Sequence, residues 1–135
     1  MQPASDAPRR ITSALGHLEL CNDAAPGEAQ SDDLVQTAGS AAWLLDGASA
    51  HNDPEACLQH DVSWFVCQLS QALATALCES ADRDLRDVLA ISIRRVSSLH
   101  AQLCSQPATG HRASATVVIV RRHHDQTGRD PSWAL

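Results

Sequence analysis

The sequence predicts an α+β fold in which an antiparallel sheet carries two consecutive helices on one face. Strand-like segments lie before residue 50 and after residue 113, whereas apolar residues between 61 and 105 recur at helical spacing. Helices that follow each other, instead of alternating with strands, favour an antiparallel sheet with the helices on one side. The glycines are isolated and form no glycine-rich phosphate loop, which disfavours a doubly wound nucleotide-binding fold.

The composition indicates one domain with an aliphatic core. The chain has 135 residues, of which 44% are hydrophobic and only 3% are aromatic. Residues 1–87 contain 14 acidic residues and 4 arginines, so this part of the chain suits a cation better than a nucleic acid. No segment approaches the roughly 20 apolar residues that span a bilayer, and the N-terminus lacks the pattern of a secretory signal. We therefore expect a cytoplasmic protein with no membrane or nucleic-acid partner.

The strands that precede the helices are expected in three segments. Residues 1–10 are polar and contain two prolines, so we expect a flexible tail before a domain that spans 11–135. Apolar residues alternate with small or polar ones in 11–20, which predicts a strand. Segments 34–37 and 42–46 predict two short strands that pair as a hairpin around a Gly-Ser turn.

Two amphipathic helices follow this hairpin. Asp61 is predicted to cap the first helix, which carries one apolar stripe and ends near residues 79–80. Asp82 or Asp84 is expected to begin the second helix, whose inward-facing residues extend to Leu103.

The last strands lie near the C-terminus. Segment 114–122 is β-branched and continuous, so its middle is expected to be buried on both faces. Segment 132–135 begins a further strand after a turn. The predicted order is therefore β-β-β-α-α-β-β, with the helices adjacent.

The five cysteines are predicted to be buried or idle thiols. Their number is odd and no pair has C-x-x-C spacing, which argues against a disulfide framework and against a zinc site built on thiolates. Unpaired cysteines are commonly buried as small apolar residues. The five are Cys21, Cys57, Cys67, Cys78 and Cys104.

Asp46 and Gly47 end an apolar strand and invite two interpretations. In the first, the carboxylate caps a turn and the glycine supplies a positive φ. In the second, Asp46 binds a hard cation, Mg²⁺ or Mn²⁺, through oxygen ligands that include the Gly47 carbonyl. The predicted hairpin would place Asp33, from the acidic pair Asp32-Asp33, beside Asp46 so that both share one ion.

Three segments resemble a known family in their order and spacing. The segments are EAQSDDLVQTAGSAAWLLDGAS, HDVSWFVCQLSQALATAL and SATVVIVRR. They resemble the N-terminal half of the PPM-type (protein phosphatase 2C-like) metal-dependent serine/threonine phosphatases, over about residues 11–135. The resemblance implies part of an α-β-β-α sandwich. Two metal ions at one end of its paired sheets activate the water that attacks a phosphoserine or phosphothreonine.

The resemblance also implies roles for individual residues. Asp46 matches the carboxylate that bridges both metals, and Gly47 matches the residue that lends its backbone carbonyl. Asp33 matches the aspartate of the family's Asn-Glu-Asp element, and Asp32 stands where that element has glutamate. The segment from Ser114 to Thr116 resembles the Gly-Ser/Cys-Thr-Ala segment, which opens a sheet strand and is structural only.

Several features depart from the family pattern. The phosphate-binding arginine is missing from PGEAQ, and Ala48 replaces the histidine that follows Asp-Gly in many members. His51 and His60 lie nearby without an assigned role, and a loop histidine is usually solvated. His123 and His124 would point to opposite faces of a strand and make a poor chelate.

The expected function follows from these matches and departures. The family's later metal aspartates have no equivalent after DPSWAL, so we expect the C-terminal half to be absent and phosphatase activity to be weak or lacking. The partner would be a phosphoprotein substrate, and a homodimer or another chain would cover the open sheet. Two alternatives remain: a non-enzymatic phosphatase-like binding or regulatory module, and a helical interaction protein built on 61–105.

Overall fold

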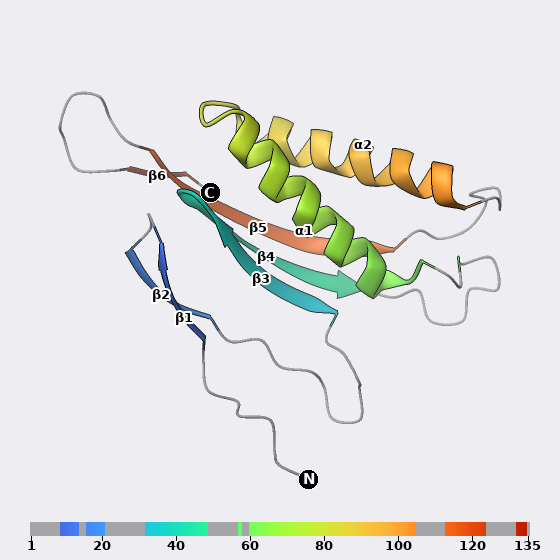
Figure 1. Cartoon of the computed structure of the whole chain (residues 1–135), viewed down its shortest axis with the longest axis horizontal. Helices are drawn as coiled ribbons and strands as arrows, with labels where there is room; N and C mark the ends of the chain where they lie inside the picture. Colours follow the sequence, from blue (N-terminus) through green and yellow to red (C-terminus); the bar gives the residue numbers. More distant parts are fainter. Residues whose placement is uncertain are drawn as a thin grey trace, which may run out of the picture.

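The computed structural model has the α+β architecture that the sequence predicts, with an antiparallel sheet and two helices (Figure 1). It describes residues 9–13, 16–20, 32–48, 57, 60–104, 113–123 and 132–134. The elements are β1 (Arg9–Ser13), β2 (Gly16–Leu20), β3 (Asp33–Ala38), β4 (Ala41–Ala48), α1 (Val62–Glu79), α2 (Leu85–Leu103), β5 (Ser114–His123) and β6 (Ser132–Ala134).

The strands form two antiparallel sheets. The larger sheet has the order β3-β4-β5-β6, and β1 pairs only with β2. The single strand predicted for 11–20 is therefore wrong, because Ile11 pairs with Leu18 and folds that segment into a hairpin. Strand β1 begins at Arg9, two residues before the predicted start of the domain, and the rest of the predicted tail lies outside the described residues.

The hairpin of β3 and β4 confirms the predicted pair of strands, each slightly longer than expected. Its two-residue turn places Gly39 at φ +55°, a left-handed conformation that glycine adopts without steric cost. This turn fixes the register, so that Ala38 lies opposite Ala41 and Asp33 lies opposite Asp46.

Helix α1 begins at its predicted cap, Asp61, and α2 begins at Asp84, one of the two residues predicted for its start. The Asp61 carboxylate accepts the backbone N–H of Trp64 at 2.9 Å, and the Asp84 carboxylate accepts that of Arg86 at 2.8 Å. Each cap satisfies an amide that has no partner within the helix. Helix α1 ends at Glu79, as predicted. Neither helix of the described chain is long and apolar enough to cross a lipid bilayer.

The core lies between α1 and one face of the sheet (Figure 1), and α2 packs mainly against α1. Leu45 of β4 and Leu73 of α1 are fully buried. The Trp43 indole N–H donates to Ser70 Oγ at 2.9 Å, which satisfies both polar groups inside this interface. The other buried apolar residues are Ala41, Val62, Val66, Leu69, Ala76, Leu77, Val88, Val96 and Ile119.

Two predictions of burial are wrong. The middle of β5 is not buried on both faces, because α1 covers one face only: Ile119 is 8% exposed, whereas its neighbour Val118 is 48% exposed. Leu103 is 56% exposed and does not face the core. The buried row of α2 runs through Val88, Ser92 and Val96 at steps of four residues, a row that passes beside Leu103.

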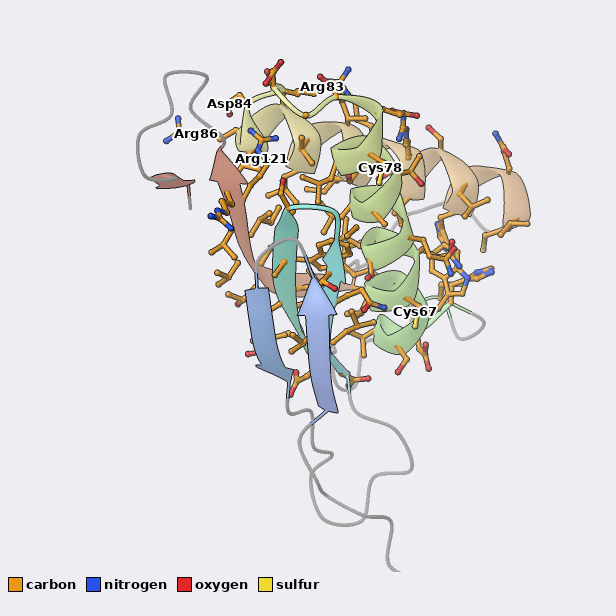
Figure 2. The ribbon with its side chains drawn as sticks, turned by 60° about the vertical axis from the view of Figure 1, so that its left-hand side comes forward. Cys67, Cys78, Arg83, Asp84, Arg86 and Arg121 are labelled. Carbon is orange, nitrogen blue, oxygen red and sulfur yellow. The ribbon has the colours of Figure 1, made fainter. Side chains whose placement is uncertain are left out.

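Arg121 anchors β5 to the connection between the helices (Figure 2). It is only 5% exposed, and its Nη2 donates to the backbone carbonyl of Arg83 at 2.7 Å. Because Arg121 lies opposite Ala41, it marks the end of the sheet away from Asp46.

Candidate functional site

The end of the β3–β4 hairpin brings two carboxylates together. Asp33 and Asp46 lie directly opposite each other in the antiparallel register, and both are exposed. Directly opposed residues point to the same face of a sheet, with Cβ atoms about 4.5–5.5 Å apart. Thr116 of β5 lies opposite Asp46 on its other side. This group occupies the face of the sheet opposite α1, because the neighbouring Leu45 is in the core.

Asp32 is held differently from this pair. Its backbone carbonyl accepts the N–H of Gly47 at 3.1 Å, and its Oδ1 accepts the hydroxyl of Ser63 at 3.0 Å. Asp32 is therefore tied to the first turn of α1. Since successive side chains of a strand alternate between faces, Asp32 and Asp33 point to opposite sides of the sheet.

Gly47 is required by close packing and not by backbone conformation. A Cβ at this position would lie 2.7 Å from the Asp32 carbonyl oxygen and 2.9 Å from the Cγ2 atoms of Val62 and Val66. Of the glycines in the described chain, only Gly39 has a positive φ. The interpretation of Asp46-Gly47 as a turn pair that needs a positive φ is therefore wrong.

A second group of metal-ligating side chains lies beside α1. Cys57, His60, His100 and Cys104 each offer one ligand atom, and these four atoms lie within 4.8 Å of one another. Cys57 Sγ is 3.3 Å from His60 Nδ1 and 3.6 Å from Cys104 Sγ. All four residues are half-buried.

The helical hairpin assembles this Cys/His cluster. Cys57 and His60 precede α1, whereas His100 lies in the last turn of α2 and Cys104 is its C-cap. The two helices run antiparallel, so the start of α1 lies beside the end of α2 (Figure 1). The Trp64 ring contacts both imidazoles, with centroid distances of 4.6 Å to His60 and 5.7 Å to His100.

The sequence-based predictions missed this cluster. His60 was expected to be solvated, and Cys57 and Cys104 were expected to be idle thiols. One signal was available in the sequence: C-x₂-H at 57–60 with H-x₃-C at 100–104. The steps of four residues that continue the buried row of α2 to His100 and Cys104 are visible only in the structure.

Among the side chains that the structure describes, no further cysteine or histidine joins the cluster. Cys67 and Cys78 are exposed at separate levels of α1 (Figure 2), so these two thiols are not buried. Cys21, His51 and His124 lie outside the described residues, and the side chain of His123 is not described.

Comparisons with known proteins do not identify this chain. No protein-family model matches it, and no curated protein or solved structure matches it significantly. The residues of the two groups described above therefore carry the information on function. Their chemistry separates the two groups: the carboxylates suit a hard cation such as Mg²⁺ or Mn²⁺, whereas sulfur and imidazole suit zinc.

Proposed function

We propose that this chain is the N-terminal portion of a PPM-type phosphatase-like domain that binds one Mg²⁺ or Mn²⁺ between Asp33 and Asp46. The observation that carries the proposal is the register of the hairpin, which sets these two carboxylates opposite each other at its end. Gly47 adds a backbone carbonyl beside them, at a position where only glycine fits.

The electrostatics of the pair favour a cation. Like charges directly opposite each other on neighbouring strands are destabilising, by a few tenths to about 1 kcal/mol. A divalent cation that contacts both carboxylates would reverse the sign of this interaction. Both side chains are exposed, so the ion would keep several of its waters, as Mg²⁺ commonly does.

The exposed face of the sheet also supports the proposal. Leu44 is 42% exposed and Val118 is 48% exposed, and both lie on the same face as Asp33 and Asp46. A second sheet would bury these residues in the sandwich that the resemblance implies, with the acidic pair at one end of the interface. We propose that a further sheet, from a second copy or another chain, covers this face.

The chain by itself would hydrolyse phosphoesters weakly or not at all. Two bound metals activate the attacking water in the resembled family, and this requires ligands on both sides of that water. The hairpin of β3 and β4 offers Asp33, Asp46 and the Gly47 carbonyl for one ion. The ancestral substrate class would be phosphoserine or phosphothreonine in proteins.

Calorimetric titration with Mn²⁺ tests the metal site. We expect a heat of binding for one ion per chain, lost in both Asp33→Asn and Asp46→Asn. Asp82→Asn is the matched control, because Asp82 is exposed in the connection between the helices, and it should bind as the unmodified chain does. Unchanged heats in the two hairpin variants would contradict the proposed site.

Turnover of p-nitrophenyl phosphate with Mn²⁺ tests the expected lack of activity. We expect rates at or near those of buffer. Robust turnover that disappears in Asp46→Asn would show that these 135 residues form a sufficient active site.

The second candidate is a non-enzymatic module that uses the phosphatase-like scaffold as a binding surface. The exposed Leu44 and Val118 favour it, since contiguous apolar surface commonly marks an interaction site. A chain that gives no Mn²⁺-dependent heat but forms a defined dimer in light scattering would support this alternative over the metal-binding one.

A further inference from the structure

We propose that Cys57, His60, His100 and Cys104 form a structural zinc site that fastens the start of α1 to the end of α2. This inference is independent of the proposed function, because it uses other residues and another class of metal. It stands on the distances, the ligand types and the position of the cluster in the fold.

Two of the distances between ligand atoms are close to those of a zinc tetrahedron. With Zn–S about 2.3 Å and Zn–N about 2.0–2.1 Å, tetrahedral geometry puts two sulfurs about 3.8 Å apart and a sulfur and a nitrogen about 3.5 Å apart. Cys57 Sγ lies 3.6 Å from Cys104 Sγ and 3.3 Å from His60 Nδ1. The remaining separations are no larger than 4.8 Å, so a bound zinc ion would have to draw these atoms together by about 1 Å.

The ligand set selects zinc and a structural role. Two thiolates balance the charge of Zn²⁺, so a Cys₂His₂ site is neutral and suits a half-buried position. The cluster contains no carboxylate, which makes it unsuitable for Mg²⁺ or Mn²⁺. Four protein ligands leave no open position for water or substrate, as in structural and unlike catalytic zinc sites.

The position of the cluster explains what zinc would do. Cys57 and His60 belong to the segment that enters α1, and Cys104 caps α2 with an N–H that donates to the His100 carbonyl at 2.8 Å. One ion would thus join two parts of the chain that are distant in sequence. Trp64 packs against both imidazoles and would limit their rotation.

A disulfide explains less of this arrangement. It would use only Cys57 and Cys104 and would give no role to the two imidazoles that lie with them. The ring centroids of His60 and His100 are 5.1 Å apart, which brings a second pair of ligands to the same point.

Metal content and cobalt spectroscopy test the site in the full chain. Protein purified under reducing conditions should contain one zinc per chain, and its Co²⁺ form should show tetrahedral d–d bands with thiolate charge-transfer bands. Loss of a residue that only supports a metal ligand typically weakens metal binding by about 10- to 100-fold. Cys104→Ser removes a ligand itself, so it should weaken zinc binding by more than this. Cys67→Ser and Cys78→Ser are the matched controls, because both cysteines are exposed on α1, and they should retain full zinc.

Alkylation of the unmodified chain tests the site without a variant that could fail to fold. Zinc should protect Cys57 and Cys104 while Cys67 and Cys78 react, and a strong chelator should expose the protected pair. Removal of zinc should also lower Tm by roughly 10 °C or more. An unchanged alkylation pattern, or a Cys57–Cys104 disulfide in a zinc-free protein under reducing conditions, would overturn the proposal.

Discussion

The acidic pair and the Cys/His cluster are built in opposite ways. Asp33 and Asp46 are exposed and come from two neighbouring strands of one hairpin. The cluster is half-buried and combines residues from both ends of a helical hairpin. The first arrangement suits a hydrated ion that exchanges freely, whereas the second suits an ion that is enclosed and retained.

Two neighbouring residues in the first turn of α1 make contacts with different groups. Ser63 donates to the carboxylate of Asp32, the residue that directly precedes Asp33. The next residue, Trp64, contacts the rings of His60 and His100. Neighbouring positions of one helix therefore support different groups, which allows each group to be perturbed separately.

The largest expected effect is on the stability of the whole fold, and it should affect the acidic pair and the Cys/His cluster alike. Leu73→Ala would remove a fully buried side chain between α1 and the sheet and cost about 2–5 kcal/mol in the free energy of unfolding. Leu103→Ala should change it by less than about 0.5 kcal/mol, because Leu103 is 56% exposed. Urea unfolding measures both. If the folded Leu73→Ala variant lost only one of the two metals, the packing of the core would support that metal site and not the other.

Gly47→Ala should perturb the acidic region and spare the cluster. The added methyl would crowd the Asp32 carbonyl and the side chains of Val62 and Val66, at a cost of about 1–3 kcal/mol. We expect the Mn²⁺-dependent heat to disappear while the zinc content stays at one per chain. Gly39→Ala is the control: its added methyl meets no atom within 4 Å, so it adds only backbone strain at φ +55°. If Gly39→Ala also abolished the Mn²⁺ heat, the effect would not be local.

Two neighbouring substitutions in α1 sharpen the comparison. Ser63→Ala should cost about 0.5–1.5 kcal/mol through the lost hydrogen bond to Asp32 and weaken Mn²⁺ binding. Trp64→Leu should cost a similar amount, about 0.5–1.5 kcal/mol, through the lost ring contacts, and it should raise the rate of zinc release to a chelator. Calorimetry with Mn²⁺ should detect a change in Ser63→Ala but not in Trp64→Leu, and the kinetics of zinc release to a chelator should show the reverse. Equal effects on both metals would mean that the turn acts as one unit.

The sequence could predict the features that depend on residues close together in the chain, but not the feature that depends on the packing of two helices. Asp61 was recognised as a cap, and Asp84 as one of two candidates, because a cap depends on its own and the next few residues. Asp33 and Asp46 were placed together because a two-residue turn fixes the register of a hairpin. The Cys/His cluster depends on how two helices pack.

That packing depends on a rotation which periodicity alone does not fix. Leu103 was predicted to face inward, whereas the row that faces inward ends at its neighbour Cys104. A shift of one residue turns a helix by about 100°, which is enough to move the ligands of the cluster from the surface to the helix interface. The burial of β5 was overestimated for a related reason, because its β-branched composition does not say that α1 covers only one face.

The smallest expected effect gives the most direct test of the acidic region. In the absence of divalent cations, Asp46→Asn should stabilise the fold by a few tenths to about 1 kcal/mol, because it removes the repulsion from Asp33 across the hairpin. This gain should shrink as salt is added, since both side chains are exposed. With Mn²⁺ the order should reverse, because only the unmodified chain gains the free energy of ion binding. Thermal unfolding at increasing Mn²⁺ should therefore give two curves that cross, whereas a capping role for Asp46 would make the variant less stable at every Mn²⁺ concentration.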